Sequence, residues 1–165
     1  MNVRVDVKPP QTAEDHEWLR DLWRTGWGGE TMISKGREHH IQNMESFIAW
    51  HQGGRAGAAT YRVEGAECEL MSLNANVEGR GIGGALLASV EDAARGTGIG
   101  RIWLITSNDN VDALRFYQCK GYRMAAVYPG AVDEARKQKP SIPLIGCCGI
   151  PVRDEIELEK WLEEV

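Results

Sequence analysis

The sequence predicts a mixed α/β domain, and three observations along the chain carry that prediction. Strand-like segments separated by short glycine turns gather between residues 46 and 75, a pattern typical of hairpins. A glycine-rich loop at residues 79–84 then leads into a helical pattern over residues 82–95, where apolar residues recur on one face. The continuous apolar run at residues 101–106 indicates an interior parallel strand. Hairpins followed by a strand–helix–strand unit imply one mixed sheet.

Length and composition indicate one soluble domain over residues 1–165. Hydrophobic residues make up 42% and charged residues 26% of the chain, which is ordinary for a globular protein. No apolar run approaches the roughly 20 residues that span a bilayer, and residues 1–8 lack the apolar stretch of a signal peptide. We therefore expect a cytoplasmic protein that does not contact a membrane. The formal net charge of −5 argues against nucleic acid as a partner.

The four cysteines predict neither a disulfide framework nor a metal site. Cys68, Cys119, Cys147 and Cys148 contain no C-x-x-C pair, and adjacent cysteines cannot form an ordinary disulfide without strain. We expect reduced thiols and no bound metal.

The remaining elements follow from local signals. Thr12 before Glu14 and Asp15 predicts a helix start, with acids where the helix dipole favours them. Residues 25–45 show no clear pattern, and residues 153–162 fit either a strand or a helix. The other expected elements are a strand at 2–8, a helix from Asn108 or Asn110 to about Lys120, a strand at 122–128 and a helix at 130–138.

The glycine loop carries the clearest chemical signal. Glycines between a strand and a helix let backbone N–H groups approach a ligand at the positive end of the helix dipole, which suits a pyrophosphate. Gly79-x-Gly81-x-x-Gly84 also satisfies the dinucleotide-binding pattern. That fold usually places its loop after the first strand and an acid at the end of the next one. Here several strands precede the loop, and the next strand ends in Thr106-Ser107-Asn108.

Two motifs, in order and correctly spaced, resemble the GNAT superfamily of acetyl-CoA-dependent N-acetyltransferases. The loop of that family reads Q/R-x-x-G-x-G/A, and here residues 78–83 match its glycines but begin with Glu78. The later family helix reads N-x-x-A-x-x-F-Y-x-x-x-G-F/Y and is matched throughout residues 110–122. The resemblance implies a GNAT fold, in which splayed parallel strands of a mixed central sheet are flanked by helices. Residues 130–155 also look like the tail of one bacterial branch of the superfamily.

The resemblance implies acetyl-CoA as co-substrate and assigns residues to it. Leu73 and Ala75 match positions whose main chain pairs with the pantetheine arm, and Asn110 matches a side chain that contacts this arm. An equally simple interpretation of Asn110 is a helix cap, and both can hold. The pyrophosphate would lie on the amides of the loop and first helical turn, namely Arg80, Gly81, Ile82, Gly83, Gly84 and Ala85.

Catalytic candidates follow from the same resemblance. Direct transfer needs a proton for the departing thiolate, and the phenol of Tyr117, with a pKa of about 10, is a competent donor. The alternative interpretation is that Tyr117 is a core aromatic residue without a catalytic role. Glu69 matches an acidic position that some members use as a base, with Glu67 on the same strand face. A histidine, a chain of water molecules, or no base at all remain alternatives.

The acceptor is the least determined part. Trp27 and His39 are the candidates for the acceptor pocket, while Arg153-Asp154-Glu155 reads by default as a solvated strand end. The expected function is acetyl transfer from acetyl-CoA to a primary amine, of a small molecule or a protein, within a ternary complex. A degenerate domain that binds acyl-CoA as a sensor or interaction module is the alternative. A homodimer is also compatible with the resemblance, because edge strands of this fold often pair between subunits.

Overall fold

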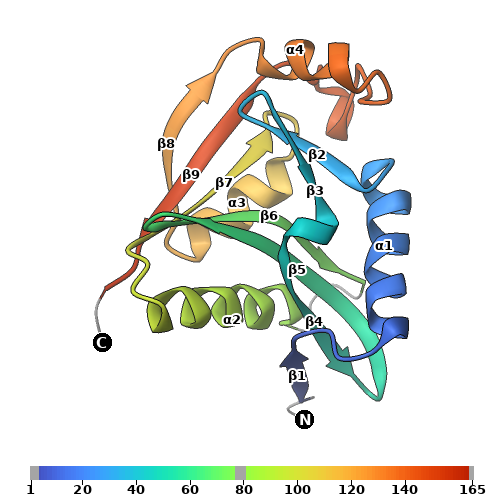
Figure 1. Cartoon of the computed structure of the whole chain (residues 1–165). Helices are drawn as coiled ribbons and strands as arrows, with labels where there is room; N and C mark the ends of the chain where they lie inside the picture. Colours follow the sequence, from blue (N-terminus) through green and yellow to red (C-terminus); the bar gives the residue numbers. More distant parts are fainter. Residues whose placement is uncertain (1–3, 77–80, 164–165) are drawn as a thin grey trace.

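A seven-stranded mixed sheet forms the centre of the molecule (Figure 1). The computed structural model describes residues 4–76 and 81–163, apart from the side chain of Trp27. The strand order is β1-β4-β5-β6-β7-β9-β8, and β2 and β3 form a separate hairpin. The elements are β1 (Val5–Lys8), α1 (Ala13–Trp27), β2 (Thr31–Ser34), β3 (Arg37–His40), β4 (Glu45–His51), β5 (Gly54–Glu64), β6 (Glu67–Ala75), α2 (Ile82–Gly96), β7 (Arg101–Ser107), α3 (Val111–Cys119), β8 (Arg123–Tyr128), α4 (Ala131–Gln138) and β9 (Glu155–Trp161), with short 3-10 turns at Ile41–Asn43 and Cys147–Gly149.

The central strands β6 and β7 are parallel and diverge, which confirms the predicted fold class. Their pairing ends at Glu69 opposite Trp103, although β6 continues to Ala75 and β7 to Ser107. On its other edge β6 pairs with β5, and the register skips Met71 because Thr60 lies opposite Ser72 and Tyr61 opposite Leu70. Such a bulge bends a strand away from its neighbour. The polar groups of the diverging strand ends therefore face a gap and not each other.

The two faces of the sheet carry different elements. Helices α2 and α3 pack on one face, where Leu86, Val90 and Tyr117 join Ile102 and Leu158 in the larger core cluster. Helix α1 covers the other face with a second cluster of buried residues, Leu19, Trp23, Ile41, Ile48, Ala58 and Met71. Both faces of the central strands are therefore covered, which explains the continuous apolar runs in their sequences.

Local signals located several elements correctly. Thr12 caps α1 by accepting from the amide of Asp15 at 3.1 Å, and the Asp15 carboxylate accepts in return from the Thr12 amide. This reciprocal pair satisfies two N–H groups that a helix start would otherwise leave free. The unpatterned residues 25–45 contain the β2–β3 hairpin, and residues 153–162 contain β9, which lies between β7 and β8. No helix in the described part of the chain is long and apolar enough to cross a membrane.

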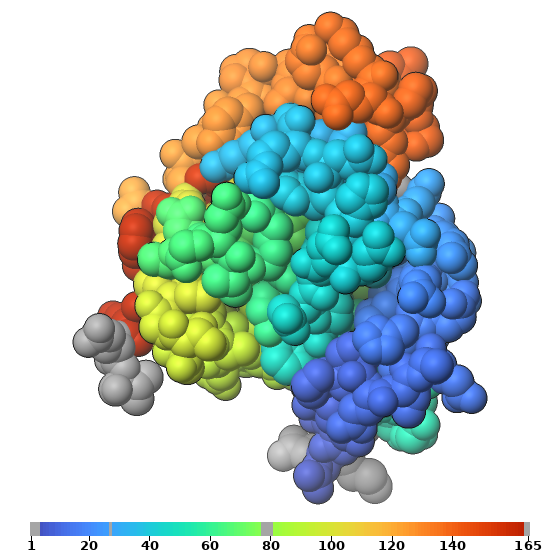
Figure 2. Space-filling model, in the orientation of Figure 1, coloured from blue at the N-terminus to red at the C-terminus, as the bar shows by residue number. Residues whose placement is uncertain are grey.

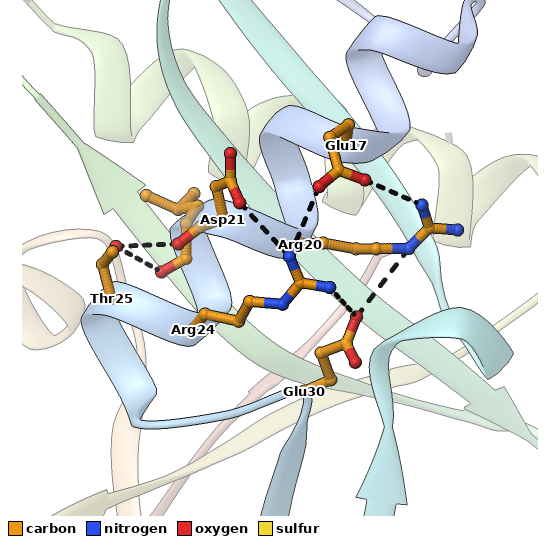
Figure 3. A network of polar contacts seen from close by, with 7 residues as sticks. Glu17, Arg20, Asp21, Arg24, Thr25 and Glu30 are labelled. Carbon is orange, nitrogen blue, oxygen red and sulfur yellow. Dashed lines mark hydrogen bonds and ion pairs between the residues drawn. The ribbon is translucent and has the colours of Figure 1, made fainter.

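The β2–β3 hairpin covers the sheet face opposite α2. Figure 2 shows it packed between α1 and the segment that carries α4. At its base, Glu30 receives ion pairs from Arg20 at 3.8 Å and Arg24 at 3.3 Å, and both arginines also contact Glu17 (Figure 3). Each exposed pair contributes little alone, but the network links the end of α1 to the start of the hairpin. The hairpin therefore has a defined position over the sheet.

Candidate active site

A cavity of about 520 Å³ lies at the diverging ends of β6 and β7. Leu73 and Ser72 from β6 and Ile105 from β7 line it beside Tyr117 of α3. Its far side is built from β2, α1, α4, β9 and the loops next to them, with the lining residues Gly26, Gly28, Met32, Ile33, Val132, Ala135, Lys139, Ser141, Ile142, Pro143, Val152 and Glu155. The splay of the sheet thus produces a space that elements from both of its faces reach.

The first turn of α2 leaves backbone donors available beside the splayed strands. Gly81 caps the helix with φ +73, a left-handed conformation that favours glycine, and no side chain caps the turn. The Ala85 amide donates to the Gly81 carbonyl at 3.0 Å and is therefore part of the helix ladder. The amides of Ile82, Gly83 and Gly84 precede the first bond of that ladder. Of the residues predicted to hold a pyrophosphate, these three fit best, while Arg80 lies outside the described residues.

A lysine that the sequence analysis missed lies beside this turn. A Cβ on Gly84 would lie 3.2 Å from the Lys120 ammonium, and the same ammonium lies 5.7 Å from the centre of the Phe116 ring. Lys120 follows α3 directly in sequence, so its proximity to α2 depends on how the two helices pack. A cation next to free helix N–H groups strengthens a site for an anion.

The residues predicted to hold the pantetheine arm lie along the splay. Leu73 lines the cavity, and Ala75 is the exposed last residue of β6, paired with Gly57 of β5. Asn110 also lines the cavity while its side chain accepts from the Ala113 amide at 3.3 Å. Both interpretations of Asn110 are thus compatible with the structure.

Tyr117 is buried and lines the cavity from the α3 side. Its ring makes edge contacts with Phe116 and Tyr122, at centroid separations of 5.1 and 5.6 Å. Burial raises the pKa of its phenol well above the ordinary value, so the hydroxyl stays protonated at neutral pH. Tyr117 is therefore a core aromatic residue that also borders the cavity, and its role as proton donor stays a prediction.

Glu69 is held in a polar network outside the cavity lining. Ser34 donates to one of its carboxylate oxygens at 2.6 Å and Arg62 to the other at 2.8 Å. Burial raises the pKa of Glu69, and the bonds from Ser34 and Arg62 oppose that shift. Glu69 thereby fastens the hairpin to the sheet at the point where β6 and β7 part.

Of the two residues predicted for the acceptor pocket, the structure places only His39. His39 is buried on β3 but is not part of the cavity lining, and burial followed by the charges of Arg62 and Arg37 lowers its pKa. Trp27 ends α1, and its side chain lies outside the described residues. Its neighbours Gly26 and Gly28 do border the cavity.

Glu155 lines the cavity, although the sequence reads as a solvated strand end. Glu155 is only 7% exposed, and burial raises the pKa of its carboxyl group. The other carboxylate at the cavity is Asp109, which accepts from the Ser107 hydroxyl and from the Cys147 amide. The sequence does contain a signal for the strand itself, because charged and apolar residues alternate from Glu155 to Glu159.

Two orphaned groups test whether a long polar ligand fits this site. The Ser72 hydroxyl lines the cavity and is buried with no hydrogen-bond partner in the described chain. The uncapped amides at the start of α2, outside the cavity lining, are a second set of donors without an intrahelical partner. Buried polar groups rarely remain unpaired, so both fit an arm with amide groups that ends in phosphates. Within residues 4–76 and 81–163, no group of three or more His, Cys, Asp or Glu side chains could hold a metal ion.

The diverging strands with the cavity at their ends, and the uncapped glycine turn at the start of α2, define the architecture of an acyl-CoA-dependent acetyltransferase. The Acetyltransferase (GNAT) family matches residues 14–122 of the chain. The chain therefore belongs to this family, as the two sequence motifs predicted.

Comparisons with individual proteins support the same assignment. The uncharacterised protein YdhI of Bacillus subtilis (strain 168) is 41% identical over 146 residues, covering 88% of this chain and 91% of YdhI. An acetyltransferase of Bacillus subtilis, solved in complex with CoA, has a TM-score of 0.73 at 17% identity over 97% of this chain and 100% of that one. A GNAT family acetyltransferase of Elizabethkingia anophelis with acetyl-CoA bound has a TM-score of 0.71 at 19% identity, covering 96% of this chain and 98% of the other. These structural similarities support the fold.

Proposed function

We propose that this protein transfers the acetyl group of acetyl-CoA to a primary amine by direct attack within a ternary complex. The observation that carries the proposal is the cavity at the β6–β7 splay, which Tyr117 and Leu73 border beside the uncapped turn of α2. Acetyl-CoA supplies the activated thioester. The amides of Ile82 to Gly84 and the Lys120 ammonium would bind its pyrophosphate, and the main chain near Leu73 would bind its arm.

The chemistry assigned to the protein is positioning and proton transfer. Holding the amine next to the thioester supplies much of the rate, because a bimolecular reaction becomes intramolecular. The amine nitrogen forms the new bond to the carbonyl carbon as the carbon–sulfur bond breaks. The Tyr117 phenol gives its proton to the departing thiolate, and its raised pKa keeps that proton available at neutral pH.

A binding module without turnover is the second candidate from a different class. Such a domain needs the cofactor groups but no acid at the cavity. Tyr117 in the cavity lining favours the enzyme.

The test is CoA release from acetyl-CoA across a panel of primary amines, with polyamines, aminoglycosides, amino acids, alkylamines and peptide N-termini represented. Because Cys119, Cys147 and Cys148 are exposed, a thiol reagent also titrates the enzyme, so the signal without acceptor is subtracted. We expect turnover with one class of amine. Tyr117→Phe should lower kcat at least tenfold and leave the Kd of acetyl-CoA unchanged.

Two results would oppose the proposal. Tight acetyl-CoA binding without turnover on any amine would favour the binding module. Unchanged kcat in Tyr117→Phe would remove Tyr117 from the mechanism and leave it as a core aromatic residue.

A further inference from the structure

Strand β9 carries a row of carboxylates on the sheet face opposite α2. Glu155, Glu157 and Glu159 alternate along the strand with Leu158, which packs in the α2 core. Arg101 pairs with Glu157 and with Glu159, at 2.6 Å each, and Lys35 pairs with Glu157 at 2.6 Å. The row therefore runs from a neutralised region toward the cavity, where it ends in Glu155.

Glu155 is the member of this row that lacks a cation. Among the described residues no lysine or arginine forms an ion pair with it, and the donor that acts on its carboxylate is the backbone amide of Lys35. Burying a carboxylate without a counter-ion is costly even when one amide donates to it, so its place at a cavity wall suits a ligand that supplies the missing positive charge.

None of the described groups around Glu155 supplies an unpaired positive charge to its carboxylate. Glu69 on β6 adds negative charge, and burial and Glu69 together raise the pKa of Glu155. Ser107 of β7 and Tyr128 of β8 are its register neighbours, and Lys35 and Arg101 are already paired with Glu157. Within the cavity, Asp109 is hydrogen-bonded to Ser107, Tyr117 is neutral, and the Lys139 ammonium donates to the Thr31 carbonyl at 3.0 Å.

The hairpin and the C-terminal segments contribute apolar residues to the wall of the cavity that Glu155 lines. Met32 and Ile33 come from the hairpin, Val132 from α4, and Ile142 and Val152 from the segments that flank the second 3-10 turn. A ligand seated here would bury a hydrocarbon body against these side chains while its charged end meets Glu155. Tyr117 belongs to the core on the α2 face, so the two groups approach the cavity from opposite faces of the sheet.

We propose that Glu155 binds the ammonium group of the acceptor and takes its proton, and that the acceptor is a primary amine on an apolar body. This inference rests on the proposed acetyl transfer and names its acceptor class and base. The ammonium gives one proton to the Glu155 carboxylate, which becomes a carboxylic acid, and the neutral amine attacks the thioester. As the carbon–nitrogen bond forms, the nitrogen releases its second proton to solvent. The departing thiolate takes the proton of Tyr117, which solvent then restores, and the Glu155 carboxylic acid releases its proton to solvent.

Binding of hexylamine to the protein saturated with CoA tests the first part without turnover. Hexan-1-ol is the uncharged probe of the same length, and Glu159→Gln is the matched control on the same strand face. We expect Glu155→Gln to raise the Kd of hexylamine at least tenfold while the Kd values of CoA and hexan-1-ol change less than twofold. Glu155→Asp keeps the charge and should restore part of the hexylamine affinity. Equal hexylamine affinity in wild type and Glu155→Gln, or no binding to wild type at millimolar concentration, would overturn the inference.

The pH profile of kcat/KM for hexylamine tests the second part. Protonation of Glu155 removes the base, so activity should fall on the acid side, and the raised pKa places this limb above the ordinary range of a glutamate. Glu155→Gln should lose this limb and about 10² in kcat, which is typical of a removed general base. Retention of the limb in Glu155→Gln would overturn the role in proton transfer. CoA release with other amines but not hexylamine would overturn only the acceptor class and leave the acetyltransferase proposal intact.

Discussion

Replacing Gly57 by alanine should displace the strand that leads into the predicted cofactor site. Gly57 lies on β5, opposite Ala75 at the end of β6 and beneath the first turns of α2. A Cβ there would lie 2.4 Å from the Asn74 carbonyl oxygen, 2.9 Å from Cγ2 of Ile82 and 3.2 Å from Cδ1 of Leu86. Real Cβ contacts essentially never fall under 3.0 Å, so the β6 backbone at Asn74 must move.

The expected cost follows from those contacts. Forcing a methyl group into a packed interior costs about 1–3 kcal/mol, and the lower entropy of the unfolded chain returns about 0.4–1 kcal/mol. We expect Gly57→Ala to lose about 1–2 kcal/mol, or about 2–8 °C in Tm for a chain of this size. Because the displaced groups adjoin Leu73 and Ile82, the Kd of acetyl-CoA should also rise severalfold.

Urea denaturation and calorimetric titration with acetyl-CoA measure the two effects. Gly96→Ala is the matched control, since Gly96 ends α2 and a Cβ there meets nothing within 4 Å. Its stability should change by less than about 1 kcal/mol, in the stabilising direction. A Gly57→Ala protein as stable as wild type, with unchanged acetyl-CoA affinity, would refute the packing argument.

Three further substitutions test other parts of the structure. Thr12→Ala removes the acceptor that caps α1 and should cost about 1 kcal/mol by urea denaturation, whereas Thr12→Ser should cost far less; equal losses would contradict the capping role. Burial and then two nearby arginines lower the pKa of His39, so its stabilising effect is complete above the unfolded value of 6.5 and is lost as pH falls. Between pH 7 and pH 5, the free energy of unfolding should fall less in His39→Gln than in wild type. An equal fall in both proteins would contradict this role of His39. Arg101→Met leaves Glu157 and Glu159 without the guanidinium that pairs with both. The free energy of unfolding, followed by thermal denaturation, should fall by about 3 kcal/mol. An unchanged free energy of unfolding would mean that solvent replaces the ion pairs.

The elements that local chemistry specifies were predictable from the sequence. The α2 turn needs glycine at the left-handed Gly81, α3 needs an acceptor such as Asn110 at its start, and α1 needs the cap at Thr12. Each signal lies within a few residues of the feature it produces. The predicted helix at 82–95 and the observed α2, Ile82–Gly96, accordingly differ by one residue.

The β2–β3 hairpin and the position of β9 could not be predicted in the same way. The hairpin turns at Lys35 and Gly36, both with positive φ, and Lys35 is held by Trp103 at 4.2 Å and by Glu157, which lies more than a hundred residues later. Strand β9 lies between β7 and β8 although it follows both in the chain. These placements depend on long-range contacts, for which a single sequence carries no local signal.

The residues of the candidate site also fall into a group that the sequence identifies and a group that only the fold brings together. Tyr117 and Asn110 belong to the second family motif and Leu73 to the strand before the glycine loop, and all three line the cavity. Glu155 reads as one charged residue among several at a strand end, and only its position beside the splay makes it a wall of the cavity. Lys120 likewise reaches the α2 turn through helix packing and not through sequence spacing.

Crystal structures of two complexes that cannot react, one with acetyl-CoA alone and one with CoA and hexylamine, test the proposed site most directly. We expect the pyrophosphate on the amides of Ile82, Gly83 and Gly84, the acetyl group between the diverging ends of β6 and β7 near the Tyr117 hydroxyl, and the ammonium at Glu155. A cofactor bound elsewhere on the chain, or an acetyl group remote from Tyr117, would contradict this proposal.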